Sequence, residues 1–181
     1  IPAQSNRLVN DYVGLLDAGQ QQRLERKLLA YDDSTSTQIA IVNERSLEGE
    51  DIFDYSYRLA ESWGIGRAGK DNGILIYIAL QDRELFIQTG YGAEGFLTDA
   101  MASRIIEQVI KPAFRREAYF QGLDEATSII MQLGSGEYDN TEVRRDSSGT
   151  ARQALKILLL IIVVLIILSN LFNRGDDWDD W

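Results

Sequence analysis

Two short apolar runs separated by a helical pattern constrain the fold of this chain more than any other feature of its sequence. The runs span residues 38–42 and 73–80, and neither alternates regularly between apolar and polar residues. Such continuous apolar character is typical of strands that are buried on both faces of a sheet. Between the runs, Ile52, Leu59 and Trp63 recur on one side of a helix. A strand, a crossover helix and a second strand predict a right-handed unit with two parallel strands.

Three further helices and one further strand extend this unit. Residues 83–88 follow the second run too closely for a crossover, so we expect them to return as an antiparallel strand. Helical patterns begin near Asp17, at the N-cap Thr98 and near Tyr119, and we expect the second of these to end before Pro112. The sequence therefore predicts an α/β fold, a three-layer α/β/α sandwich on a small mixed sheet.

The C-terminal part of the chain has the features of a membrane anchor. We expect the sandwich to fill residues 1–136, and residues 137–153 are polar and charged without apolar periodicity, as in a linker. Residues 154–172 form a long apolar run, which predicts one transmembrane helix in a lipid bilayer. Residues 173–181 form an acidic, Trp-containing tail.

The orientation of this anchor depends on whether a signal peptide precedes the chain. Arg144, Arg145, Arg152 and Lys156 precede most of the apolar run and only Arg174 follows it, so the positive-inside rule alone would keep the domain in the cytoplasm. A signal peptide would instead translocate a large N-terminal domain regardless of these charges. The sequence does not begin with Met, so either a leader was removed or a boundary was chosen. We expect a signal peptide and a periplasmic domain on the inner (cytoplasmic) membrane.

The composition excludes several kinds of chemistry. The chain has no His and no Cys, so it offers no imidazole base, no thiolate nucleophile and no zinc site built from these side chains. A net charge of -10 and the lack of a basic stripe argue against binding to nucleic acid. A site must therefore use carboxylates, hydroxyls, Lys, Arg, Tyr and backbone groups, and carboxylates suit Ca²⁺ or Mg²⁺.

Two glycine-rich turns have the spacing of nucleotide-binding loops without their context. Residues 90–95 match G-x-G-x-x-G, but the preceding strand is expected to be antiparallel and Glu94 would place a carboxylate beside a pyrophosphate. Residues 64–71 come close to a P-loop, but they follow a helix and carry Asp71 where a Ser or Thr is needed. We therefore expect neither a dinucleotide nor a nucleoside triphosphate as ligand.

The acids on these turns are the stronger candidates for a site. Asp71 leads into the second apolar run, Glu94 lies in the turn after the antiparallel strand, and Asp99 opens the third helix. An antiparallel pair places the start of one strand beside the end of the other, so we expect Asp71 and the turn with Glu94 to be neighbours. With backbone carbonyls and waters, the three carboxylates would hold Ca²⁺ or Mg²⁺. The alternative is that they are ordinary turn and helix-start residues.

Aromatic residues flank the same turns. Trp63, Tyr91 and Phe96 form either an exposed binding rim or part of the core. The Trp residues of the tail 173–181 pose a similar choice, between anchors at the membrane interface or a partner contact on one side and a solvated terminus on the other.

Six short segments follow one another in a specific order and spacing. They are VNDYVGLL (9–16), TQIAIV (37–42), WGIG (63–66), KDNG (70–73), GYGAEG (90–95) and TDA (98–100). In this arrangement the chain resembles the TPM domain family over residues 7–138. The resemblance implies an α/β/α sandwich and, in bacterial members, a signal peptide, an extracytoplasmic domain and often a C-terminal membrane helix. It also implies a divalent cation held by acids, which falls here on Asp71, Glu94 and Asp99, with Asp11 as an addition.

Two classes of function follow from the resemblance. Plant relatives in the thylakoid lumen are linked to photosystem II repair and reported as acid phosphatases. The class that we favour is a membrane-anchored extracytoplasmic module that docks on an integral membrane protein complex, or helps to assemble or maintain it. The alternative is metal-dependent phosphoester hydrolysis, in which the cation polarises a phosphoryl oxygen or activates water. The chain lacks His and, apart from Arg67 and Lys70, an evident cationic clamp for phosphate.

Overall fold

The computed structural model describes residues 1–136, which form an α/β domain on a four-stranded sheet. The strands lie side by side in chain order, β1-β2-β3-β4. Their bounds are β1 Val9–Asp11, β2 Gln38–Glu44, β3 Gly73–Ala79 and β4 Glu84–Thr89. The first three strands are parallel and β4 runs antiparallel to β3, so the sheet is mixed, as predicted.

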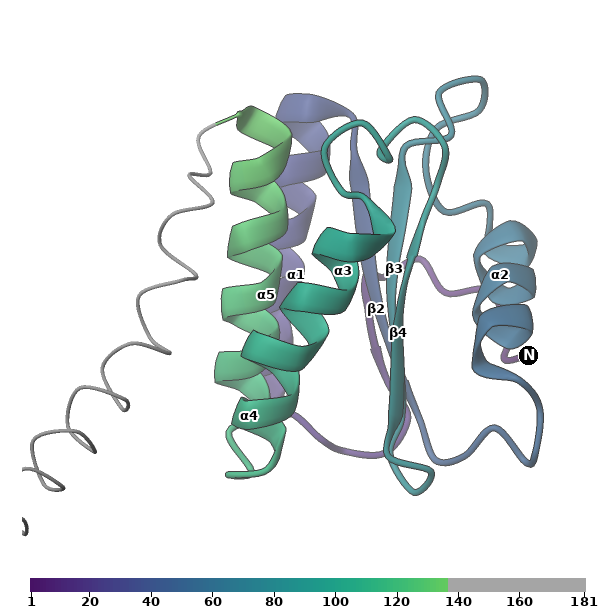
Figure 1. The fold of residues 1–181 in the computed structure, drawn as a ribbon, viewed down its shortest axis with the longest axis vertical. Coiled ribbons are helices and arrows are strands. Elements are labelled where there is room, and N and C mark those ends of the chain that lie inside the picture. The colour runs from purple at the N-terminus through teal and green to yellow at the C-terminus, as the bar shows by residue number, and fades with distance from the viewer. Residues whose placement is uncertain (137–181) are drawn as a thin grey trace, which may run out of the picture. The chain divides into compact units, whose positions relative to one another are not determined.

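Helices lie on both faces of this sheet (Figure 1). Their bounds are α1 Ala18–Thr35, α2 Ile52–Trp63, α3 Asp99–Ile105, the π-helical turn η1 Ile106–Ile110, α4 Lys111–Phe114 and α5 Tyr119–Ser135. Helix α2 covers one face, and α1, α3, α4 and α5 lie on the other. The sheet therefore separates one helix from the rest.

The two central strands supply both cores of the domain. In β2, Ile39 and Ile41 pack among the residues of α1 and α5, whereas Ala40 and Val42 pack with those of α2. All residues of β3 are buried. Burial on both faces explains why these strands are continuously apolar in sequence.

Short polar side chains fix where the helices begin. Asp17 caps α1 by accepting a hydrogen bond from the Gln20 N–H, and the Gln20 side chain accepts one from the Asp17 N–H, which completes a capping box. Asp51 caps α2 and Thr98 caps α3. The cap predicted at Thr98 is therefore confirmed.

Pro112 does not end the third helix, and the predicted boundary is wrong. Helix α3 widens into η1, where the Lys111 N–H bonds to the Ile106 carbonyl, and the chain continues as α4 to Phe114. Pro112 lies in the first turn of α4. Proline lacks an N–H and its ring clashes with the carbonyl four residues earlier in a regular helix. A π-helical turn just before it changes that spacing, so the chain stays helical past the proline.

The predicted linker 137–153, transmembrane helix 154–172 and tail 173–181 lie outside the described residues. Among residues 1–136, no helix is long and apolar enough to cross a bilayer. Helix α1, with 18 residues, buries Leu24 and Leu28 on one side and carries mostly polar residues elsewhere.

Candidate functional site

Two glycine-rich loops meet at one end of the strands, where β3 begins and β4 ends. The first loop, residues 64–72, connects α2 to β3, and the second, residues 90–98, connects β4 to α3. The buried amide of Asn72 holds the first loop. Its Nδ2 donates to the Ser36 carbonyl at 2.7 Å, and its Oδ1 accepts from the Arg67 N–H at 3.0 Å. A buried amide with partners on both sides fixes the course of the loop.

The two loops touch backbone to backbone because glycines stand at the contact. The Gly92 N–H donates to the Asp71 carbonyl at 2.9 Å, and the Gly90 N–H donates to the Gly73 carbonyl at 2.8 Å. A Cβ atom on Gly92 would lie 1.9 Å from the Lys70 carbonyl oxygen, and one on Gly90 would lie 2.3 Å from the Asp71 carbonyl oxygen. Only glycine permits so close an approach. The structure thus places the two glycine-rich turns side by side.

The three predicted cation ligands are all exposed in this region. Asp71 has a left-handed backbone with φ of 48°, Glu94 lies in the second loop, and Asp99 is the first residue of α3. Within residues 1–136, no three acidic side chains gather closely enough to hold a metal ion. The residues present therefore do not form a ready cation site, and the assignment of Asp71, Glu94 and Asp99 as ligands stays a prediction.

Asp11, the additional candidate ligand, lies at the opposite end of the strands, where β1 ends. It ends β1, and its carboxylate accepts hydrogen bonds from the Val13 N–H at 3.3 Å and the Leu16 N–H at 2.8 Å. It thereby closes the connection from β1 to α1. Because β1 and β3 are parallel and Asp71 precedes β3, the structure does not bring Asp11 to the other three acids.

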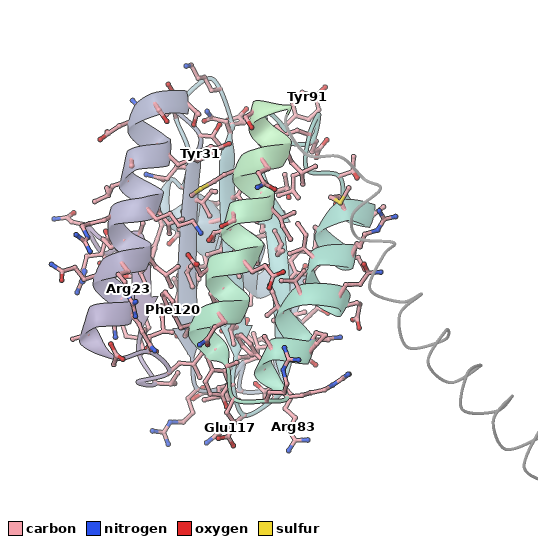
Figure 2. The ribbon with its side chains drawn as sticks, turned by 90° about the vertical axis from the view of Figure 1, so that its left-hand side faces the viewer. Arg23, Tyr31, Arg83, Tyr91, Glu117 and Phe120 are labelled. Atoms are coloured by element: carbon pink, nitrogen blue, oxygen red, sulfur yellow. The ribbon has the colours of Figure 1, made fainter. Side chains whose placement is uncertain are left out.

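The aromatic residues beside the glycine loops divide between core and surface. Trp63 is 6% exposed, and its Nε1 donates to the Pro2 carbonyl at 3.1 Å. Phe96 is half-buried and packs against the core. Tyr91 is 81% exposed and lies at one end of the domain (Figure 2). Of the three, Tyr91 is therefore the residue available to a partner.

A cluster that the sequence did not predict lies on the α2 face of the two central strands, toward their carboxyl ends. The Tyr55 hydroxyl donates to the Glu44 carboxylate at 2.8 Å, and the rings of Tyr55 and Tyr77 lie 5.2 Å apart. Burial, and then the neighbouring Glu44 carboxylate, raises the pKa of both tyrosines. The Tyr77 hydroxyl lies beside these groups, but among the described residues no partner meets it in hydrogen-bonding geometry. The one signal in the sequence is a Glu at the end of an apolar strand.

Comparison with known proteins gives a family and a fold. A family model for the TPM domain matches residues 9–133. The N-terminal domain of a P. gingivalis protein, solved by NMR, is 36% identical over 73% of this chain and 84% of that chain, with a TM-score of 0.67. Two other NMR structures share the fold at lower identity. They are the N-terminal domain of a Corynebacterium glutamicum protein (20% identical, 76% and 84% covered, TM-score 0.55) and the BA42 protein of the psychrophilic bacterium Bizionia argentinensis (18%, 71% and 87%, 0.60). The comparison with curated proteins gave no match.

Proposed function

This chain belongs to the TPM domain family, and on that premise we propose that its described domain is a docking module on the outer side of a cytoplasmic membrane. The module docks on an integral membrane protein complex and helps to assemble or maintain it. The predicted anchor 154–172 ties it to the bilayer. The docking surface is formed by the paired glycine loops, residues 64–72 and 90–98.

One observation carries this proposal: Tyr91 is 81% exposed on a loop whose backbone is hydrogen-bonded to its neighbour. Tyrosine contributes a large contact area and a polar hydroxyl, and it is enriched at protein interfaces. A loop that is already ordered loses little conformational freedom when a partner binds. An exposed aromatic side chain on a preorganised loop is therefore better suited to docking than to catalysis.

The charge of the docking surface indicates what the partner must offer. Within the two loops Arg67 and Lys70 accompany Asp71 and Glu94, and Asp99 follows at the start of α3, so the surface carries both signs. A partner surface with charges of both signs complements it. In our proposal a Ca²⁺ or Mg²⁺ ion also joins the surface, when the exposed side chains turn toward a common point. Ca²⁺ accepts carboxylate, carbonyl and water oxygens in flexible geometry.

Site-specific photo-crosslinking in native membranes tests the docking. A photoreactive amino acid replaces Tyr91 in the full chain, and a matched chain carries it at Tyr57, which is 50% exposed on α2. We expect one discrete crosslinked product from position 91 and none from position 57. Equal labelling from both positions, or no product from either, would overturn the proposed docking surface.

A titration tests the cation separately. We expect Ca²⁺ or Mg²⁺ added to the full chain in detergent to produce saturable amide chemical shift changes centred on Asp71, Glu94 and Asp99, and the Glu94→Gln variant to lose them. No change at millimolar concentrations would exclude the ion and leave the docking proposal intact. Turnover of a phosphoester that Asp71→Asn abolishes would instead favour the hydrolase alternative.

A further inference from the structure

A hollow lies at the end of the domain opposite to the glycine loops. Its volume is about 580 Å³, and the end of β3, the β3–β4 hairpin and the turn between α4 and α5 line it. Figure 2 shows Arg83 and Glu117 from its lining at the end of the domain away from Tyr91. Sites for small ligands have volumes of about 300–1,000 Å³, and in α/β proteins they lie at the carboxyl ends of the parallel strands. Both the size and the position of this hollow fit that rule.

Apolar and aromatic side chains form part of the lining of the hollow. Ile78 and Leu85 come from the paired strands β3 and β4, and Phe114 and Tyr119 come from the helices. The rings of Phe114 and Tyr119 pack edge to face, with centroids 5.0 Å apart and an interplanar angle of 84°. A ligand for this hollow therefore carries an apolar body.

Each side of the hollow presents one positive and one negative charge. The hairpin supplies Arg83 and Glu84, and the turn after α4 supplies Arg115 and Glu117. Among the described residues, none of these four side chains forms a hydrogen bond or an ion pair. The third cation of the lining, Lys111, is paired instead with the Glu107 carboxylate. Two guanidinium groups and two carboxylates are therefore available to a ligand.

The backbone at both sides is strained in the same way. Arg83 and Glu117 each have φ of 58°, in the left-handed region where glycine is usual. A charged side chain held in such a conformation costs stability, and strain of this kind concentrates at functional sites. Glycine would fit these turns with less strain, but it would remove the charge from the edge of the hollow.

From this combination we infer that the hollow binds a small zwitterion of about dipeptide size with an apolar body. The anionic group of the ligand lies against the guanidinium groups of Arg83 and Arg115. Its ammonium group lies against the carboxylates of Glu84 and Glu117. The apolar body packs on the aromatic pair. This site is separate from the docking surface around Tyr91.

Three probes with the same body and different charges test the inference. They are the dipeptide Phe-Phe, its N-acetyl derivative, which keeps only the negative charge, and its C-terminal amide, which keeps only the positive charge. Binding of each to the full chain is measured by calorimetry. Because each capped probe lacks one charge-assisted contact, we expect Phe-Phe to bind about tenfold more tightly than either. Equal affinity for all three probes, tighter binding of a capped probe, or no binding would overturn the inference that the hollow binds a zwitterion.

Single substitutions then locate the two ends of the ligand. We expect Arg115→Gln to weaken binding of the N-acetyl probe and to leave binding of the amide probe unchanged. Glu117→Gln should weaken binding of the amide probe and leave binding of the N-acetyl probe unchanged. Arg116→Gln, which changes an adjacent exposed arginine outside the lining, serves as the matched control and should bind as wild type. A Tyr91→Ala variant should also bind all three probes as wild type, so failure of this site and failure of the docking surface give different results. If Arg115→Gln and Arg116→Gln behave alike, the assignment is wrong.

Discussion

The carbonyl oxygen of Lys70 lies 1.9 Å from the position that a Cβ atom would occupy on Gly92. Because the carbonyl oxygen belongs to the backbone and the backbone also fixes the position of a Cβ atom, no side-chain rotation relieves this clash. We expect Gly92→Ala to lower the free energy of unfolding by about 2–3 kcal/mol, as in other overpacked sites. Gly95→Ala is the control, since nothing lies within 4 Å of a Cβ at that position, and it should stay within about 0.5 kcal/mol of wild type. Urea unfolding measures both, and similar losses would contradict the proposed backbone contact.

Lys27 joins α1 to α5, and its removal should lower the free energy of unfolding of the domain. Its Nζ donates to the Asp124 carbonyl at 2.6 Å, the Asp124 carboxylate at 2.7 Å and the Ser128 hydroxyl at 2.7 Å. The carboxylate is partly exposed, so solvent screens the charge pair and the carbonyl and hydroxyl contacts carry much of the effect. We expect Lys27→Met to cost about 1–2 kcal/mol in unfolding free energy. The neighbouring Arg26→Met, on the exposed side of α1, should cost less than about 0.5 kcal/mol.

Tyr55 and Tyr77 should make the domain sensitive to alkali. Burial, and then Glu44, raises the pKa of both above the ordinary value of 10.0. The unfolded chain therefore loses these protons first as the pH rises. Their contribution to stability is complete below about pH 10 and is lost progressively as the pH rises toward the folded-state pKa values. We expect the urea midpoint to fall above about pH 10, and to fall less steeply in Tyr77→Phe. The exposed Tyr57→Phe should keep the wild-type slope, and equal slopes in all three proteins would refute this account.

Arg83→Gly should stabilise the domain while it weakens ligand binding. The left-handed backbone of Arg83 costs about 1–2 kcal/mol, and glycine removes this cost at the price of greater freedom in the unfolded chain. We expect a net gain of up to about 1 kcal/mol and weaker binding of Phe-Phe. Arg116, whose backbone is not left-handed, gives the control, because Arg116→Gly should lose about 0.5–1 kcal/mol. Thermal unfolding and calorimetry measure the two properties, and a loss of stability in Arg83→Gly would show that the backbone is not strained there.

Three of the four strands and most helix boundaries could be predicted from the sequence because local rules fix them. The three-residue strand β1 was missed, because so short a segment carries no periodicity of its own. Asp17 and Thr98 are polar caps in front of apolar patterns, and β3 is a continuous apolar run. The local sequence is therefore enough to predict each of these elements. Pro112 misled the prediction because the π-helical turn before it depends on packing. Periodicity does not report such a turn.

The candidate sites were less predictable, for two physical reasons. Sequence placed Asp71 beside the turn with Glu94 because strand pairing decides backbone neighbours, but exposed carboxylates turn freely and their side chains follow no such rule. The hollow was not predicted from the sequence because Arg83 and Arg115 have the sequence pattern of ordinary solvated charges. They become lining residues only when the hairpin and the turn after α4 meet in space.

The order of the strands bears on how this chain is made. Each strand lies beside the one that precedes it in the chain, from β1 to β4. A nascent polypeptide that leaves the ribosome from its N-terminus therefore finds every template strand already synthesised, and no strand waits with an unpaired edge for a partner much farther along. The sheet grows in the direction of synthesis, and α5, the last element of the described residues 1–136, covers a face that is by then complete.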